Sequence, residues 1–284
     1  MGRLLILLGS FWLASGQAAT IDWPQFETAT RQTLVDLIRL DTSQPQGNEY
    51  LATDYLKQRL DAVGIPATVY EAAPGRASIV ARIKGNGSKR PLLLLGHTDV
   101  VTVEPQNWSF DPFEGTVKDG KIFGRGAADD KGIVAAAFEI LLALHAQGIP
   151  LDRDVIFLGV ADEEAGGGLG ITYMIQNHLA AINAEFALNE GGRGTIDPRT
   201  GQYLSFDVGT AEKTPRRARL VAHGHAGHGS VPTRDNAIGV LAWGISRLFD
   251  TPLPMRLNET TRAFFERLAA SRPESEAAIY RAIL

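Results

Sequence analysis

Two runs of apolar residues in the middle of the chain restrict its fold more than any other feature. Pro91–Gly96 reads PLLLLG, and Asp154–Val160 reads DVIFLGV. Neither run alternates between apolar and polar residues, which is typical of central strands in a sheet that helices cover on both faces. Between them, Gly132–Pro150 has helical periodicity and a stop signal at Gly148. Strands that alternate with a helix predict an α/β fold.

The preceding segments extend this pattern. Trp23–Leu40 is predicted to be a helix because Asp22 can cap its first turn and apolar residues recur at helical spacing. Glu49–Val63 is predicted to be a second helix, since Gly64 follows it. Three further strands are expected in the stretches that read ATVYE from Ala67, SIVARI from Ser78 and EFALNEGG from Glu185.

The sequence changes character near Val208. Beyond it, Ala218–Ala222 reads as a strand, a loop rich in glycine and histidine follows, and Asn236–Leu248 reads as an amphipathic helix. We therefore predict a first domain over residues 19–208 and a smaller α+β domain over residues 209–284.

The first 18 residues have the features of an export signal. A positive charge at Arg3 precedes the apolar stretch Leu4–Ala14, and Gly16–Ala18 ends in the small-x-small pattern of a cleavage site. The apolar stretch is shorter than the ~20 residues that span a bilayer, so a membrane anchor is the less favoured alternative. We expect a cleaved signal peptide over residues 1–18, a secreted or periplasmic protein, and no stable membrane insertion.

The composition excludes several kinds of site. The chain has no cysteine, which rules out disulfides, thiolate metal sites and cysteine nucleophiles. Its net charge of −4 gives no basic surface for nucleic acid, so no nucleic-acid partner is expected. A metal ion in this protein must therefore be held by histidine and carboxylates.

Such residues follow the predicted strands. His97 and Asp99 come directly after the first apolar run, Glu163 and Glu164 follow the second, and Glu190 follows a third strand. Ligands of open α/β sheets bind beyond the carboxyl ends of strands, so these groups could share one edge. Asp129 and Asp130 would lie at the start of the intervening helix.

Each of these groups taken alone has a simpler explanation. A His-x-Asp sequence is often a turn, paired aspartates cap helices, and adjacent glutamates are mostly solvated. The combination is harder to explain, because side-by-side carboxylates repel each other unless a cation balances them. Histidine and carboxylates suit Zn²⁺, Mn²⁺ or Co²⁺.

Five short motifs occur in one order: GHTDVV, GRGAADDKG, ADEEAGG, ALNEGG and GHGSVP. Together they resemble the successive motifs of the M20 metallopeptidase family, which includes aminoacylases and carboxypeptidase S-like enzymes; the last motif favours the carboxypeptidase S-like branch. The resemblance runs from about residue 30 to residue 250. It implies a three-layer zinc-peptidase-like catalytic domain with a central twisted sheet, followed by the start of a lid or dimerisation domain.

The resemblance also implies the metal ligands. His97, Asp129 and Glu190 would hold one divalent ion, and Asp129 would bridge to a second ion that Glu164 also holds. Zinc is the expected metal, with cobalt and manganese as alternatives, and a complete subunit would hold one or two ions.

Three further residues have implied roles. Glu163 would be the general base, Asp99 would hydrogen-bond the His97 ring, and His228 on the lid would reach the active site of a partner subunit in a homodimer. The implied reaction is hydrolysis of a peptide or N-acyl-amino-acid amide bond by a metal-activated water.

The sequence departs from the family pattern after His228. Family members have a later histidine ligand for the second metal, and no histidine follows His228 here. His145 and His178 lie in predicted helices and are expected to be surface or packing residues. We therefore expect the chain to be truncated at its C-terminus; the alternative function is a non-catalytic remnant that binds one metal ion or a partner.

Overall fold

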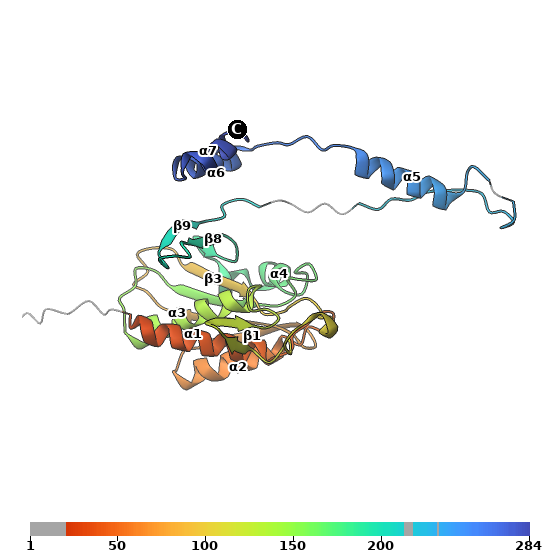
Figure 1. The fold of residues 1–284 in the computed structure, drawn as a ribbon. Coiled ribbons are helices and arrows are strands. Elements are labelled where there is room, and N and C mark those ends of the chain that lie inside the picture. Colours follow the sequence, from red (N-terminus) through yellow and green to blue (C-terminus); the bar gives the residue numbers. More distant parts are fainter. Residues whose placement is uncertain (1–20, 213–217, 232) are drawn as a thin grey trace, which may run out of the picture. The chain divides into compact units, whose positions relative to one another are not determined.

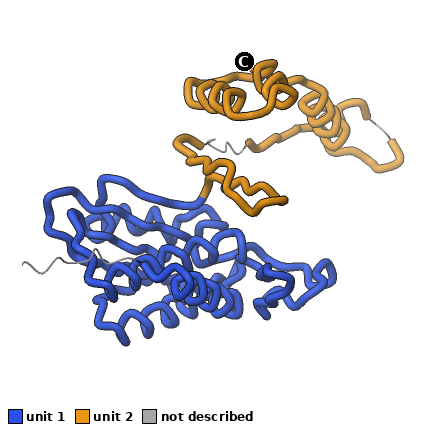
Figure 2. Tube along the Cα trace, turned by 60° about the vertical axis from the view of Figure 1, so that its left-hand side comes forward, with its two compact units in different colours: residues 1–190 blue, residues 191–284 orange. Residues whose placement is uncertain are grey.

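A computed structural model of the chain describes residues 21–212, 218–231 and 233–284. These residues divide into two compact units, of which the first ends at Glu190 and the second is Gly191–Leu284 (Figure 2). The division lies earlier in the chain than the predicted boundary after residue 208, which stays a prediction about functional domains. The predicted signal peptide lies outside the described residues.

The first unit is built around a five-stranded sheet of order β1-β2-β6-β3-β7. Strands β6, β3 and β7 are parallel, whereas β1 and β2 are antiparallel to their neighbours. This confirms the α/β fold predicted from the two apolar runs, which form β3 and β6 at the centre. The bounds of the sheet strands are Ala67–Ala73 for β1, Arg76–Ile83 for β2, Leu92–His97 for β3, Val155–Val160 for β6 and Phe186–Leu188 for β7.

Helices cover both faces of this sheet (Figure 1). On one face, Leu37, Leu56 and Phe138 pack with Leu94 and Phe157 of the central strands. On the other face, α4 contributes Met174 and Ile182 to a second cluster with alternate strand residues. Successive strand residues point to opposite faces, so a strand covered on both sides must be apolar throughout. The helices of this unit are α1 (Trp23–Ile38), α2 (Tyr50–Ala62), α3 (Lys131–Ala146) and α4 (Ile171–Ile182).

The direction of the strands decides which residues meet at the carboxyl edge of the sheet. His97 at the end of β3 lies in register with Val160 at the end of β6. Strand β2 runs the opposite way, and Ile79 near its start lies in register with Gly159. The beginning of β2 and the ends of β3 and β6 therefore share one edge.

The remaining elements are short or lie in the second unit. A 3-10 turn and a small hairpin follow β3, and they are η1 (Pro105–Asn107), β4 (Thr116–Lys118) and β5 (Lys121–Phe123). The second unit contains β8 (Arg193–Ile196), β9 (Tyr203–Asp207), α5 (Ala237–Asp250), α6 (Glu259–Ala270) and α7 (Glu274–Arg281). Within the described part of this unit, the buried residues are Ala269 and Ala277.

Several details of the predicted elements are confirmed, and one is wrong. Asp22 caps α1 by accepting a hydrogen bond from the Gln25 N–H at 3.1 Å. Asn236 caps α5 in the same way. The predicted strand at Ala218–Ala222 is wrong, since these residues have no regular structure. A strand needs a neighbour for its main-chain N–H and C=O groups, and β8 and β9 pair with each other instead.

None of the helices within the described ranges is both long and apolar enough to cross a membrane.

An ion-pair cluster at the opposite edge of the sheet gives a pH-dependent contribution to stability. Burial alone would raise the pKa of Asp154, but hydrogen bonds from Lys84, the Gly85 N–H and Arg82 outweigh it and lower the pKa to about 2. A carboxyl group whose pKa is lower in the folded than in the unfolded state stabilises the folded state at pH values above the ordinary pKa of aspartate. This stabilisation is lost as the pH falls through the pKa of the folded state.

We expect Asp154→Asn to destabilise the first unit at pH 7 by about 1 kcal/mol. This loss of stability is smaller than the free energy that corresponds to the full pKa shift, because Lys84 is largely exposed and solvent screens its ion pair with Asp154. The difference from wild type should shrink below about pH 4 and approach zero near pH 2. Urea unfolding of both proteins at a series of pH values measures it, and a difference that does not depend on pH would contradict the assignment.

Candidate metal centre

The structure brings the acidic and histidine segments together at the carboxyl edge of the sheet. His97 closes β3 and is 2% exposed. Glu163 and Glu164 follow β6, and Glu190 follows β7. Asp129 and Asp130 precede α3. Three of these four segments meet because the strands that carry them are neighbours in the sheet, and the fourth joins them because α3 packs against β3.

The Nε2 atom of His97 is the centre of this group. It lies 2.9 Å from Oδ1 of Asp129, 3.4 Å from Oε2 of Glu190 and 3.9 Å from Oε2 of Glu163. Among the described residues, two triads have ligand atoms within 4.8 Å of one another: His97 with Asp129 and Glu164, and His97 with Asp130 and Glu190. This grouping differs from the predicted one, in which Glu190 joined Asp129; the division of ligands between ions stays a prediction.

The donor set fits a divalent cation. Each triad combines one imidazole with two carboxylates, the ligands that zinc, cobalt and manganese accept. Oδ1 of Asp130 is buried and has no hydrogen-bond partner among the described residues. A buried, unpaired carboxylate oxygen is costly unless a cation or another donor satisfies it.

The electrostatics of the group agree with this fit. Burial disfavours a charged His97 ring, yet Asp99, Asp130 and Asp129 outweigh burial and raise its pKa to about 10. Burial raises the pKa of Asp130 to about 7, with Glu190 and Asp129 adding to the rise. The pKa of Glu164 is raised by burial and then by neighbouring carboxylates. In all three cases neighbouring carboxylates contribute to the rise in pKa, as expected where several acidic side chains lie close together.

Asp99 has two separate contacts with this centre. Nδ1–H of His97 donates to the main-chain oxygen of Asp99 at 2.9 Å, which leaves Nε2 facing the carboxylates. The Asp99 side-chain oxygen is 3.5 Å from Nδ1. Its carboxylate instead accepts the N–H groups of Glu163 at 3.0 Å and Glu164 at 3.1 Å, and Nε2 of Gln44 at 2.7 Å. Asp99 therefore orients both the imidazole and the turn that carries the glutamates.

Asp130 is a positioning residue that the sequence analysis did not identify. Its Oδ2 accepts the main-chain N–H of His97 at 3.1 Å. A Cβ atom on Gly96 would lie 2.8 Å from the same oxygen, so only glycine fits beside it. Lys131, fully buried, then donates to the main-chain oxygens of Leu37 at 2.9 Å and Leu40 at 2.7 Å. These contacts fix the start of α3 against β3 and the end of α1.

The other histidines have separate contacts. His228 is in the second unit, and its Nδ1 lies 2.8 Å from Oγ of Ser230. His225 pairs with Asp235 in the same unit. In the first unit, His178 packs against the Tyr70 and Tyr173 rings, and His145 approaches the main-chain oxygen of Val63. His145 and His178 are expected from the sequence to be surface or packing residues, and these contacts agree with that prediction.

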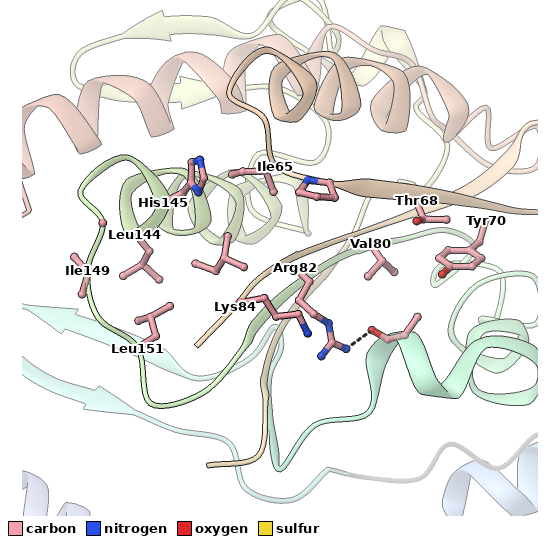
Figure 3. A pocket seen from close by; sticks show the side chains of 14 residues that line it. Ile65, Thr68, Tyr70, Val80, Arg82, Lys84, Leu144, His145, Ile149 and Leu151 are labelled. Atoms are coloured by element: carbon pink, nitrogen blue, oxygen red, sulfur yellow. Dashed lines mark hydrogen bonds between the residues drawn. The ribbon is translucent and has the colours of Figure 1, made fainter. Parts of the chain in front are cut away.

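A cavity of about 640 Å³ lies away from the candidate metal centre. It is bordered by β1, β2 and the ends of α3 and α4, and Arg82, Lys84 and His145 are among the residues that line it (Figure 3). Arg82 donates to the main-chain oxygen of Ala181 at 3.0 Å and pairs with Asp154, so its charge is already satisfied. None of the candidate metal ligands lines this cavity.

The fold and site define an α/β domain that carries a histidine–carboxylate candidate metal centre. Residues 93–277 match the model of peptidase family M20/M25/M40. The chain therefore belongs to this family, and the family resemblance seen in the sequence motifs is confirmed.

The chain is also similar to individual relatives. The chain is 34% identical to aminoacylase-1 of Sus scrofa over 203 residues, which is 70% of this chain and 48% of the relative. It is 38% identical to a carboxypeptidase S-like protein of Dictyostelium discoideum over 196 residues, 66% of this chain and 37% of the relative. The chain thus spans about half or less of the length of these relatives.

A solved structure is also similar. The M20 family metallo-carboxypeptidase Sso-CP2 of Sulfolobus solfataricus aligns with a TM-score of 0.49 at 27% identity, over 61% of this chain and 39% of that chain.

Proposed function

We propose that this chain is part of a metal-dependent amidohydrolase that cleaves a peptide bond or the amide bond of an N-acyl amino acid. The observation that carries the proposal is the convergence of His97 with Asp129, Glu163, Glu164 and Glu190 at one sheet edge in a member of the M20 family. The names of the aminoacylase and carboxypeptidase S-like relatives support the substrate class.

His97, Asp129, Glu164 and Glu190 would hold the metal, with zinc favoured and cobalt or manganese as alternatives. A bound divalent ion polarises a carbonyl group and lowers the pKa of water, so that a nucleophile forms near neutral pH. His97 can ligate through Nε2, because its Nδ1–H is donated to the main-chain oxygen of Asp99.

Glu163 is suited to proton transfer. Its side chain is 49% exposed and its Oε2 lies 3.9 Å from Nε2 of His97, so it faces both the cluster and the solvent from which substrate arrives. As general base it would take a proton from water and return that proton to the leaving amine. Glu164 is less exposed and belongs to a candidate ligand triad, so the two adjacent glutamates would divide proton transfer and metal binding between them.

His228 would act in the site of a partner subunit. It lies in the predicted lid, residues 209–284, and an imidazole N–H suits the carbonyl oxygen of a substrate as that oxygen becomes negative. This assignment includes a homodimer formed through the lid.

Hydrolysis assays test the proposed activity directly. The chain is incubated with Zn²⁺, Co²⁺ or Mn²⁺, and the release of amino acids from N-acetyl amino acids and dipeptides is measured by mass spectrometry. Activity should be lost with a chelator and return with metal, and His145→Ala should behave as wild type. Zinc binding without hydrolysis of any substrate would favour the alternative, a non-catalytic metal-binding remnant; hydrolysis that survives chelation would contradict the metal-dependent mechanism.

We also propose that the protein is exported through residues 1–18. The motivating features are Arg3, the apolar stretch Leu4–Ala14 and the small residues before Ala19. N-terminal sequencing of protein recovered from outside the cytoplasm should begin at Ala19, and an intact Met1 would count against export.

A further inference from the structure

The turn that carries Glu163 and Glu164 is held by an unusual series of hydrogen bonds. Strand β6 ends at Val160, and the next four main-chain N–H groups all donate to side-chain oxygens from other elements. Ala161 donates to Oγ of Ser78 at 3.1 Å, and Asp162 donates to Oε1 of Glu49 at 3.1 Å. The N–H groups of the two glutamates donate to the Asp99 carboxylate. Because each N–H has its own acceptor, the path of this turn is fixed residue by residue.

Asp162 is the residue where the chain changes direction. Its φ of +67° lies in the left-handed region, which is disfavoured for residues other than glycine and which aspartate tolerates better than most. Its Oδ2 accepts the Leu169 N–H at 2.8 Å and its main-chain oxygen accepts the Gly167 N–H at 2.6 Å. Contacts around Asp162 therefore maintain a conformation that the backbone alone disfavours.

Arg76 connects Asp162 to Glu49. Its guanidinium donates to both oxygens of the Glu49 carboxylate at 2.8–3.1 Å and to Oδ1 of Asp162 at 2.7 Å. Glu49 is 0% exposed, Asp162 5% and Arg76 8%. A Cβ atom on Gly47 would lie within 2.6 Å of both Arg76 and Glu49, so the chain packs tightly against this ion pair.

The strand order explains how Arg76 reaches this turn. Because β2 runs antiparallel to β6, its first residue lies beside the end of β6 rather than at the other edge of the sheet. Glu49 lies directly before α2, at the N-cap position, and the start of that helix fixes its position. Both side chains therefore contact the turn from elements other than the one that carries Asp99, which itself contacts His97 of the candidate metal centre.

Stability alone does not account for this cluster. Buried ion pairs are costly to desolvate, and apolar residues of similar volume are often as good or better for stability. One guanidinium faces two carboxylates here, which leaves an excess of buried negative charge. What the arrangement does provide is a fixed geometry for the residue that immediately precedes the proposed base and ligand.

We propose that Glu49 and Arg76 are positioning residues that hold Asp162 in its left-handed conformation and thereby aim Glu163 and Glu164 at the metal centre. The part of this inference that concerns catalysis rests on the proposed function. The part that concerns the turn rests on the contacts above and can be measured without metal or substrate.

Amide hydrogen exchange of the metal-free full chain tests the positioning. In Arg76→Met, exchange of the N–H groups of residues 161–164 should become at least about tenfold faster, because Glu49 and Asp162 lose the guanidinium that holds them and the turn is no longer fixed. The matched control is Arg59→Met, which removes the 2.7 Å pair of Arg59 with Glu139 elsewhere in the first unit. This control should leave residues 161–164 at the wild-type rate even though it also loses an arginine–glutamate pair.

A second variant covers the case in which Arg76→Met does not fold. Asp162→Asn keeps the size of the side chain and its tolerance of positive φ, but one of its two contacts, to Arg76 or to the Leu169 N–H, must be lost. Exchange of residues 161–164 should be about threefold faster in this variant. Wild-type exchange in Asp162→Asn, or in folded Arg76→Met, would overturn the proposal.

Zinc titration with the same variants separates this inference from the proposed function. If the wild-type chain binds Zn²⁺, the dissociation constant of Arg76→Met should rise by about tenfold, as is common when residues that orient ligands are removed. The Arg59→Met control should bind as wild type, and equal affinity in Arg76→Met would overturn the link to the metal centre. If the wild-type chain binds no Zn²⁺, the proposed function fails while the exchange experiment still decides the role of Arg76.

Discussion

Replacing Glu163 by glutamine is expected to lower kcat by about 10²–10⁴-fold while metal content stays at the wild-type level. Glutamine keeps the size and hydrogen-bonding capacity of the side chain but cannot accept a proton. The 3.9 Å separation of Glu163 from Nε2 of His97 and its 49% exposure suit proton transfer better than ligation. The measurement is steady-state hydrolysis, with metal analysis of the same samples.

Glu164→Gln is the matched control for this experiment. A neutral amide is a poorer ligand than a carboxylate, so Glu164→Gln should weaken metal binding, and its activity should recover in part at high metal concentration. Exchanged phenotypes would mean that the two roles are assigned the wrong way round. If both variants hydrolyse the substrates like wild type, the turn after β6 is not a catalytic centre.

Replacing His97 by alanine is expected to weaken zinc binding by at least about 100-fold. The two candidate triads both use His97, and Nδ1 of this residue is hydrogen-bonded to a main-chain oxygen, so Nε2 is the ring nitrogen that can ligate, and it can bind one ion at a time. We therefore also expect the wild-type chain to hold at most one firmly bound divalent ion. Metal analysis after dialysis and titration with Zn²⁺ measure both quantities.

His145→Ala serves as the control for His97→Ala, because His145 lies at the exposed end of α3 and contacts a main-chain oxygen. It should retain wild-type affinity. Two firmly bound ions per wild-type chain, or an unchanged dissociation constant in His97→Ala, would contradict the proposed ligand set.

The sequence predicts those parts of the fold that have a local signature. The apolar runs predict β3 and β6, because a strand covered on both faces cannot alternate, and Asp22 and Asn236 mark the starts of α1 and α5 because their side chains cap N–H groups a few residues on. The strand predicted at Ala218–Ala222 is wrong because pairing with a neighbour, rather than composition, decides whether such a segment forms a ladder.

The residues of the candidate site likewise fall into those that the sequence could identify and those that it could not. His97, Asp129, Glu164 and Glu190 could be identified since each follows a strand or precedes a helix that is visible in the sequence. Their supporting residues could not: Arg76 contacts Asp162 across 86 positions, and Glu49 does so across 113. The main-chain hydrogen bond from His97 to Asp130 depends equally on how α3 packs against β3. No local pattern encodes such contacts, because they arise only when the sheet is assembled.

The antiparallel direction of β2 therefore has a consequence for how the protein folds. Pairing β2 with β6 closes a long loop, which costs conformational entropy. That cost comes before the contacts between the two strands can stabilise the fold. The candidate metal centre depends on the same step, since the turn after β6 takes its acceptors from the residue before α2, from β2 and from the segment after β3. An unfolded chain consequently offers no such site. If the centre binds a divalent ion as proposed, the ion will bind folded molecules selectively, and the supply of metal in the surrounding compartment will help to set how much of the protein stays folded.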